Sequence, residues 1–322
     1  MTRPLLRALF SLAALAASAA ADTATAQTWP DHPVKVILGS SAGSSIDFVT
    51  RTYTQYLSNK LNQSVIVENR PGANGEIATQ AAARSRADGY TLLSMANNSL
   101  IHQAAGKSKQ DVRTDFQILG LAGRSPWAVS VASSAPFKSL RDVVDFGRRE
   151  PGKLTYASIG GASVPDYIAQ KLSESGKIDL LAVPYASTSD ARVDVLTGRV
   201  NLWITAMATV LTLNEAGQVR VLTVSGDAPP EALKNVPTMT QAGFPALNAE
   251  SLYFFLTPAG TAPAIVERLN LEINNAQQDA GVLEKLRSQG VFPRLGKTAD
   301  STRVVLDELA LWTKVMSPGT AK

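Results

Sequence analysis

The sequence of 322 residues contains no cysteine and only two histidines, His32 and His102. The absence of cysteine excludes disulfides, thiolate nucleophiles, thiolate metal ligands and any lipid anchor attached to an N-terminal cysteine. Two histidines that lie far apart in the sequence leave no credible zinc site. We therefore expect a protein without metal or cofactor, stabilised by a large hydrophobic core rather than by covalent cross-links.

Long hydrophobic runs are also scarce. The apolar run of residues 8–21 is shorter than the roughly 20 residues that a transmembrane helix needs. Arg3 and Arg7 precede this run, and the small residues Ala24-Thr25-Ala26 follow it, which is the layout of a cleavable secretory signal. We expect residues 1–26 to be removed on export and the mature protein to be soluble in the periplasm.

Clustered charge of one sign is missing as well. The 31 basic and 27 acidic side chains fall to 29 and 26 when Arg3, Arg7 and Asp22 are removed with the signal, which leaves a net charge of +3. This excess is too small and too dispersed to indicate nucleic-acid binding. The mature chain is also longer than one hydrophobic core usually supports, so we expect two domains.

The mature chain alternates short β-branched runs with helical patterns. A first β-α-β-α-β set is followed by a second set that begins after about residue 125, and the last stretch contains only helices. The predicted strands are Val34–Leu38, Val65–Val67, Thr91–Met95, Trp127–Val131, Thr155–Ser158, Leu181–Val183, Leu202–Thr205, Val219–Val224 and Tyr253–Thr257. The predicted helices are Ile46–Leu61, Glu76–Arg84, Leu140–Arg148, Val164–Glu174, Asp190–Leu196, Ala264–Asp279, Val282–Ser288 and Ala299–Lys314.

This order of elements favours an α/β fold with two domains, each a mostly parallel sheet flanked by helices. A late strand followed only by helices indicates that the chain crosses between the domains twice. The second crossing would return the C-terminal helices to the first domain. We therefore predict a discontinuous domain 1 of residues 27–125 and 253–322, and a domain 2 of residues 126–252.

Two glycine- and serine-rich segments each join a predicted strand to a predicted helix N-terminus. The first turn of a helix has free N–H groups and the positive end of the helix dipole, so such a segment can bind a carboxylate or phosphate without Arg or Lys. Ser163 and Asp166 also match a capping box. The alternative is that both segments are ordinary connections, since Gly and Ser are common there. The candidate ligand contacts are Ser40, Ser41, Ala42, Gly43, Ser44, Ser45 and Asp47 in the first segment, and Ser158, Ile159, Gly160, Gly161 and Ser163 in the second.

Other candidate contacts follow further predicted strands. Ligands of open α/β sheets bind at the carboxyl ends of the strands, where Asn97, Asn98 and Ser99 follow one strand and Tyr185 another. These side chains could hydrogen-bond a ligand. Asn-Asn-Ser is also common turn material, and Tyr185 could instead pack at the strand end, so both interpretations stay open.

The first segment also contains Gly39-x-Ser41-x-Gly43, the spacing of a hydrolase nucleophile elbow. A catalytic serine needs a histidine base that an acid orients. His32 precedes the serine, and the acids between Ser41 and His102, such as Asp88, lie in polar turns. We therefore interpret Ser41 as a hydrogen-bond donor and keep a serine hydrolase as the less favoured alternative.

Five short segments together resemble the Bug family, the extracytoplasmic solute receptors of tripartite tricarboxylate transporters. The resemblance covers essentially the whole mature chain. It implies a type II-like, two-domain Venus flytrap of the periplasmic binding protein class, with a carboxylate held by loop backbone groups and ordered waters rather than by an arginine. The segments are Val67-Glu68-Asn69-Arg70-Pro71-Gly72-Ala73-Asn74-Gly75, Asp88-Gly89-Tyr90-Thr91-Leu92-Leu93, Pro151-Gly152-Lys153-Leu154, Val183-Pro184-Tyr185 and Pro258-Ala259-Gly260-Thr261.

The chain departs from this family pattern where the ligand would bind. In the first loop, Gly39, Ala42 and Ser44 replace the two prolines and the second glycine that the family usually has. The family's Phe-Asp pair is Ile204-Thr205 here, so an acid that could meet an amino group is absent, and we count Thr205 as a candidate contact. The resemblance therefore carries the fold and the binding role, but not the identity of the ligand.

The sequence thus predicts a receptor, not an enzyme, that closes on a small organic carboxylate and presents it to a membrane transporter. We expect a monomer that binds no nucleic acid. A ligand-dependent partner of a membrane sensor protein is an alternative that the sequence leaves open.

Overall fold

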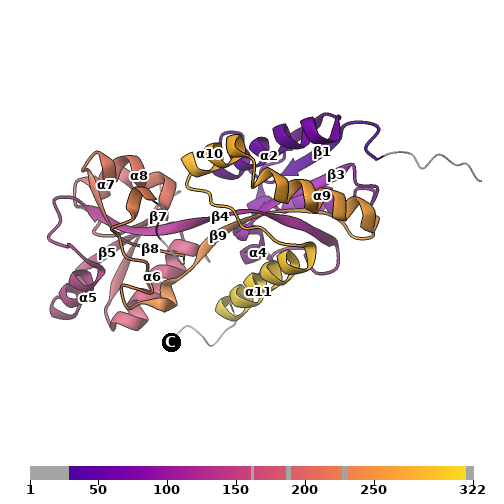
Figure 1. Ribbon diagram of the computed structural model, residues 1–322. Helices are drawn as coiled ribbons and strands as arrows, with labels where there is room; N and C mark the ends of the chain where they lie inside the picture. The colour runs from indigo at the N-terminus through magenta and orange to yellow at the C-terminus, as the bar shows by residue number, and fades with distance from the viewer. Residues whose placement is uncertain (1–28, 161–162, 186–189, 227–228, 230, 317–322) are drawn as a thin grey trace, which may run out of the picture.

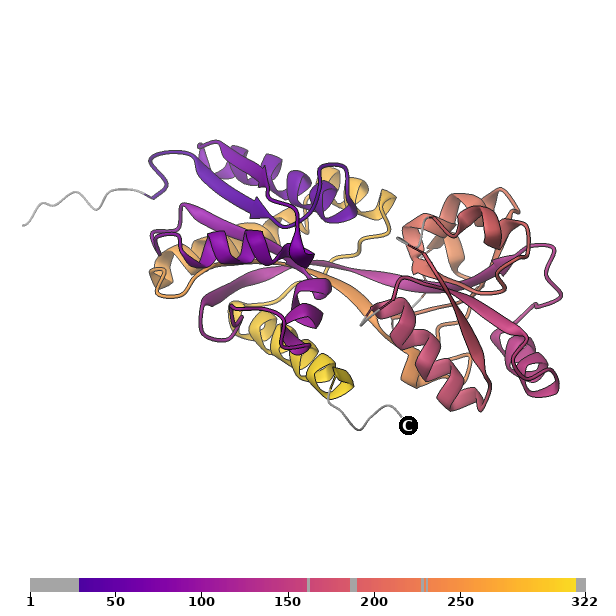
Figure 2. The same cartoon turned by 180° about the vertical axis from the view of Figure 1, so that it is seen from behind.

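The computed structural model describes residues 29–316, except for residues 161–162, 186–189, 227–228 and 230. The predicted signal peptide and Gly161 lie outside the described residues. The described chain forms two lobes, and long strands run from one lobe into the other (Figure 1). The view from behind shows the same division, with the C-terminal helices beside the N-terminal strands (Figure 2).

The first lobe is built around three parallel strands in the order β2-β1-β3. The helix after β1 begins where Ser44 caps it, and its apolar stripe of Val49, Tyr53 and Leu57 is fully buried in the core of this lobe. The elements are β1 (Val34–Leu38), α2 (Ser45–Leu61), β2 (Val65–Asn69), α3 (Glu76–Ala83), β3 (Thr91–Ala96) and α4 (Asn97–Ala104).

Two antiparallel strands join the lobes. They are β4 (Phe116–Ala132) and β9 (Glu250–Pro258), which pair along the whole of β9, and β9 also pairs with β3. The ladder is irregular near Gly120 and Gly123. A Cβ atom on Gly123 would lie 2.9 Å from the carbonyl oxygen of Phe292, so the bend requires glycine there.

The second lobe surrounds the last part of β4. Strands β7 and β8 pair with β4 in antiparallel fashion, whereas β5 and β6 form a separate parallel pair. Trp203 is fully buried in this lobe, and Leu154, Ile168 and Leu172 form part of a second cluster. The elements are α5 (Leu140–Arg149), β5 (Leu154–Ser158), α6 (Val164–Gly176), β6 (Leu180–Pro184), α7 (Arg192–Leu196), β7 (Trp203–Ala206), α8 (Met207–Glu215) and β8 (Val219–Val224).

After β9 the chain returns to the first lobe. Leu269 and Ile273 of the first returning helix are buried beside Tyr53. The last helix packs on α4, and Trp312 near its end lies against Tyr167 of α6, with the ring centroids 5.3 Å apart. This helix therefore belongs to the first lobe but also contacts the second. The three helices are α9 (Pro263–Ala276), α10 (Ala280–Ser288) and α11 (Thr298–Met316).

The predicted α/β fold with two domains is confirmed, but the prediction of mostly parallel sheets needs correction. The main sheet is mixed, since β4 carries the chain into the second lobe and β9 carries it back in the opposite direction. We propose to keep the domain boundaries after residues 125 and 252. Both positions lie where β4 and β9 pass between the lobes.

Candidate functional site

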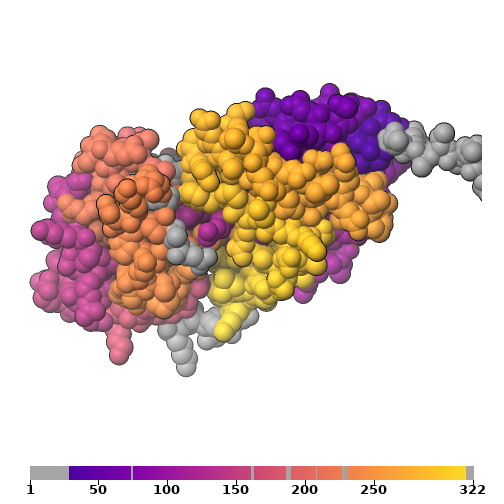
Figure 3. Space-filling model, in the orientation of Figure 1, coloured from indigo at the N-terminus to yellow at the C-terminus, as the bar shows by residue number. Residues whose placement is uncertain are grey.

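A cleft of about 600 Å³ lies between the two lobes, and Figure 3 shows the surface hollowed there. The beginnings of α2, α4 and α6 form its walls, together with parts of β4 and β9. No acidic residue is among the described residues that line it, and Lys107 is their one lysine or arginine. The lining residues are Ser44, Ser45, Ile46, Ala96, Asn97, Asn98, Ile101, His102, Ala105, Lys107, Trp127, Ile159, Gly160, Ser163, Val164, Pro165, Ser251 and Tyr253.

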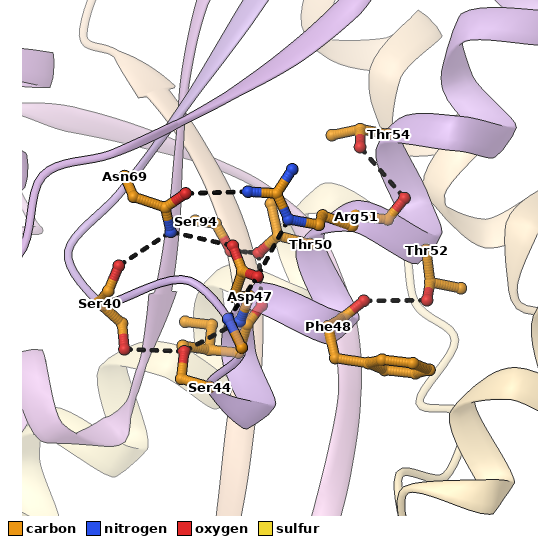
Figure 4. Close-up of polar contacts among 12 residues, drawn as sticks. Ser40, Ser44, Asp47, Phe48, Thr50, Arg51, Thr52, Thr54, Asn69 and Ser94 are labelled. Carbon is orange, nitrogen blue, oxygen red and sulfur yellow. Dashed lines mark hydrogen bonds and ion pairs between the residues drawn. The ribbon is translucent and has the colours of Figure 1, made fainter.

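Asp47 organises the first loop from the inside (Figure 4). Its carboxylate accepts hydrogen bonds from the backbone N of Gly43 at 3.0 Å, from Nε of Arg51 at 3.0 Å and from Nδ2 of Asn69 at 2.9 Å. With its side chain 5 % exposed, Asp47 is directed into the loop. We therefore assign the Asp47 carboxylate to loop structure rather than to ligand contact.

These hydrogen bonds favour the ionised form of Asp47. Burial on its own raises the pKa of the carboxyl, but the hydrogen bonds from Arg51, Asn69 and Gly43 outweigh burial and lower the pKa below the usual 3.8. The folded loop therefore keeps the stabilising contribution of this carboxylate at neutral pH and loses it only as the pH falls through the lowered pKa.

The second loop has an equivalent anchor in Asp166. Its carboxylate accepts hydrogen bonds from Ser158 Oγ at 2.5 Å, from the Tyr156 hydroxyl at 2.9 Å and from the Ser163 hydroxyl. Burial, together with the Asp166 carboxylate, raises the pKa of Tyr156 to about 12, so this hydroxyl remains a donor. The backbone N of Gly160 donates to Ser158 Oγ at 3.0 Å. Ser158 and Ser163 thus use their hydroxyl hydrogens within the loop.

Both loops repeat one arrangement at the start of a helix. A serine occupies the N-cap position, and an aspartate three residues later binds the loop from the inside: Ser44 with Asp47, and Ser163 with Asp166. The first N–H groups of a helix have no partner within the helix and carry partial positive charge. Because α2 and α6 begin on different lobes of one cleft, their N-termini can together bind an anion.

Hydroxyl groups on β9 and the first loop add donors to the cleft. Ser251 Oγ accepts a hydrogen bond from Trp127 Nε1 at 2.9 Å, which leaves the hydroxyl hydrogen of Ser251 to donate. Ser45 Oγ and the Tyr253 hydroxyl lie 3.0 Å apart and share one hydrogen bond. One of these two hydrogens therefore stays available to a ligand.

Asn97 begins α4 instead of forming a turn after β3. Its side chain is nearly fully buried, and Nδ2 donates to the Glu250 carbonyl at 2.9 Å and to the Glu308 carboxylate at 2.5 Å. Its Oδ1 accepts from the backbone N of Leu252. Asn97 therefore joins the cleft wall to β9 and α11. Both of its amide hydrogens and one of the two acceptor positions of Oδ1 are used within the protein.

Glu308 provides a pH-dependent prediction at this junction. Burial raises the pKa of Glu308, and the nearby Glu250 raises it further. The hydrogen bonds from Trp312 Nε1 and Asn97 Nδ2 and the charge of Arg294 lower the pKa but do not outweigh burial. A carboxyl with a raised folded pKa contributes stability below its unfolded pKa of about 4.3 and loses that contribution as the pH rises through the folded pKa.

At pH values above the folded-state pKa of Glu308, we expect Glu308→Gln to be more stable than the natural chain, because glutamine keeps an acceptor oxygen without the buried charge. Thermal unfolding between pH 4 and pH 8 tests this. The difference between variant and natural chain should grow with pH, and a difference that is the same at every pH would contradict the assignment.

Seven of the candidate residues meet in the cleft, and others lie in two adjoining cavities. The cleft brings together Ser44, Ser45, Asn97, Asn98, Ile159, Gly160 and Ser163. Ser40, Ser41 and Ser99 line a cavity of about 300 Å³ behind the first loop. Gly43 and Asp47 line a cavity of about 650 Å³ between α2, α8 and α10, to which Ser44 and Ser45 also belong.

Four candidates line none of these three cavities. Ala42 is exposed on the first loop, and Ser158 is buried beneath the second. The Tyr185 hydroxyl donates to Asp194 of α7 at 2.7 Å, and Thr205 is fully buried in β7. Tyr185 and Thr205 therefore stabilise the second lobe, and we no longer propose them as ligand contacts.

The cleft also contains residues that the sequence did not single out. Those with polar or aromatic side chains are His102 and Lys107 at the end of α4, Trp127 on β4, and Ser251 and Tyr253 on β9, none of which was predicted as a ligand contact. For Trp127, Ser251 and Tyr253, the predicted domain boundaries after residues 125 and 252 were a usable signal, since residues next to a crossing between domains must lie near the cleft. His102 and Lys107 had no such signal, because α4 itself was not predicted.

The structure does not assemble a hydrolase site around Ser41. His32 lies beside Asp31 and stacks on Tyr90, with the ring centroids 3.5 Å apart, and His102 lines the cleft, whereas Ser41 lines the cavity behind the first loop. Among the described residues, no group of three or more His, Asp or Glu side chains could hold a metal ion. In the same residues, no helix is long and apolar enough to span a membrane.

Known proteins share this fold and most of the sequence length. Protein BugT of Bordetella pertussis is 30 % identical over 314 residues, which cover 96 % of this chain and 95 % of BugT. A solved structure described as a periplasmic transporter has a TM-score of 0.78 and 27 % identity, with 91 % of this chain and 99 % of that chain covered. A protein of R. palustris solved with adipate has a TM-score of 0.75 and 28 % identity, with 89 % and 97 % covered.

A family model supplies the broader classification. The model of the tripartite tricarboxylate transporter family receptor matches residues 49–318, which is most of the chain. The proteins of this family are periplasmic solute-binding receptors and not enzymes, so the hydrolase alternative is set aside. The chain belongs to this TctC, or Bug-type, family of receptors.

Proposed function

We propose that the exported chain captures a small organic carboxylate in the cleft between its lobes and delivers it to a tripartite tricarboxylate-type membrane transporter. In this proposal residues 1–26 act as the signal peptide, and the mature receptor works as a monomer. The ligand contacts are the first turns of α2 and α6, with Ser44, Ser45, Asn98, Gly160 and Ser251 beside them.

One observation carries the proposal. Two helix N-termini from different lobes line a single cleft that no described acidic side chain lines. Hydrogen bonds from N–H groups to an ionised acceptor are roughly twice as strong as neutral ones, so this cleft favours an anion without an arginine. The adipate complex of the R. palustris relative supports a carboxylate as the ligand class.

A survey of ligands retained by the purified periplasmic protein tests the proposal. Denaturing the protein should release a small acid that mass spectrometry identifies. In calorimetric titration this acid should bind the protein again, and its amide should bind at least about tenfold more weakly. A retained ligand without an anionic group, or an amide that binds as well as its acid, would contradict the proposal. Membrane proteins captured with the liganded receptor would separate a transporter partner from a sensor.

A further inference from the structure

We propose that Lys107 recognises a second anionic group on the ligand, so that the receptor prefers acids in which an apolar segment separates two anionic groups. This inference rests on the proposed function, because it assumes that the first carboxylate binds at the starts of α2 and α6. It names Lys107 as a specificity-determining residue and narrows the ligand to a class of dianions.

The cleft extends along one face of α4. Asn98, Ile101 and Ala105 are spaced three and four residues apart and all line it, and Lys107 follows just beyond the helix end. With a rise of about 1.5 Å per residue, Asn98 and Ala105 are about 10 Å apart along the helix axis. Ser45 at the start of α2 is hydrogen-bonded to Tyr253, which pairs with Ala96 directly before α4. The start of α2 therefore lies at the Asn98 end of this wall, and Lys107 lies at the other end.

The backbone at Lys107 is fixed by the way α4 ends. Gly106 has a φ of +68°. The backbone N of Gly106 donates to the Gln103 carbonyl at 2.8 Å, and the backbone N of Lys107 donates to the His102 carbonyl at 3.1 Å. These two bonds form a Schellman motif, which directs the chain across the helix end. Lys107 is thereby placed at the cleft by helix termination and not by a loop without defined structure.

The ammonium of Lys107 is not neutralised by the protein. Within the part of the chain that the structure describes, it has no ion pair or hydrogen-bond partner, and the side chain is exposed. No described acidic residue lines the cleft with it. A full positive charge that faces an acid-free cleft attracts an anion at a range of several ångströms, and the attraction weakens with salt.

Apolar side chains line much of this path, with His102 of α4 as a polar neighbour. Ile101 lies on α4 between Asn98 and Lys107, and Trp127, Val164 and Pro165 line the same cleft. A methylene chain or a ring packed against these side chains is removed from water, which favours binding, whereas hydroxyl groups on that segment would be desolvated without a partner. The cleft therefore suits an apolar spacer between the two anionic groups.

Calorimetric titration with α,ω-dicarboxylic acids of four to eight carbons, adipate among them, tests the inference. Each is compared with the monocarboxylic acid of the same carbon number. We expect at least one diacid to bind about tenfold more tightly than its monoacid. Lys107→Gln should reduce that ratio by about fivefold and Lys107→Glu by more, with little change for the monoacid. Added salt should also reduce the preference for the diacid over the monoacid, and it should reduce this preference more in the natural chain than in Lys107→Gln.

Lys109→Gln is the matched control, since Lys109 is exposed two residues away and lines none of the three cavities. It should leave the ratio of diacid to monoacid affinity unchanged. Equal binding of monoacids and diacids, or an unchanged ratio in Lys107→Gln, would overturn the role of Lys107 while leaving carboxylate binding intact. If no acid of either series binds and the retained ligand is not an anion, the proposed function itself fails.

Discussion

Replacing Asn97 with alanine should lower the free energy of unfolding by about 3 kcal/mol. The substitution removes the Asn97 partner of the Leu252 backbone N and of the Glu250 carbonyl, and it leaves the Glu308 carboxylate with only Trp312 Nε1 of its two donors. A buried polar group that loses its partner costs about 1–3 kcal/mol, and water entering from the cleft should relieve part of this penalty. Urea unfolding at pH 7 measures the effect as a lower midpoint with an unchanged slope.

Asn98 provides the control within the same helix turn. Its side chain is exposed and lines the cleft, so Asn98→Ala should change the stability by less than about 0.5 kcal/mol. It should instead weaken ligand binding. Equal destabilisation by the two substitutions would show that Asn97 does not tie α4 to β9 and α11.

Gly43→Val and Gly160→Val should each weaken carboxylate binding by at least about tenfold, or roughly 1.4 kcal/mol. Both glycines have positive φ, at +82° and +75°, where a β-branched residue is strained. A Cβ atom at either position would meet no other protein atom within 4 Å. At Gly43 the expected loss comes from redirecting the N–H groups at the start of α2. Gly160 lines the cleft, so its substitution also puts a side chain in the space that the ligand needs. Neither loss comes from a clash in the core.

Gly198→Val and Gly243→Val are matched controls. Their φ values of +76° and +89° resemble those of the loop glycines, the space around them is equally open, and they line none of the three cavities. They should lower stability by a similar amount without affecting affinity. Calorimetry on variants shown by circular dichroism to be folded makes the comparison. Normal binding by both loop variants would mean that the loops are connections only.

Much of the fold could be predicted because its helices and strands carry clear apolar periodicity. The predicted strand Val34–Leu38 agrees with β1 at both ends, and the predicted helix Ile46–Leu61 differs from α2 by one residue. The first half of β4 was not predicted, because Gly120, Gly123 and Pro126 are typical strand breakers. In the structure the glycines lie at irregularities of the ladder, and Pro126 pairs where β9 begins.

The missed helices explain why the site was predicted only in part. Helix α8 is nine residues long and mixes threonine with apolar residues, so its sequence carries only a weak helical period. Helix α4 is eight residues long and begins with Asn97 and Asn98, which are typical of turns. Both asparagines were correctly associated with a strand end. Their different roles depend on the direction in which each points from α4, which the order of residues does not reveal.

Tyr185 and Thr205 illustrate a second limit. Each follows or belongs to a predicted strand at the edge where ligands commonly bind, yet Asp194 engages the Tyr185 hydroxyl and β7 buries Thr205. Which neighbour satisfies a polar side chain depends on contacts between distant segments. The loops were easier to predict, because glycine, serine and the helix start that follows are adjacent in the sequence.

The central claim is that a carboxylate draws the two lobes together around the cleft. Since α6 already contacts α11, closure should narrow the cavity of about 650 Å³ between α8 and α10. The chain has no cysteine, so Thr212→Cys on α8 and Arg287→Cys on α10, both at exposed positions, can carry spin labels without competing sites. Electron spin resonance should show a shorter distance between the labels when the retained acid is added, and no change with its amide. Saturating binding of the acid, verified by calorimetry, with an unchanged distance would contradict the account.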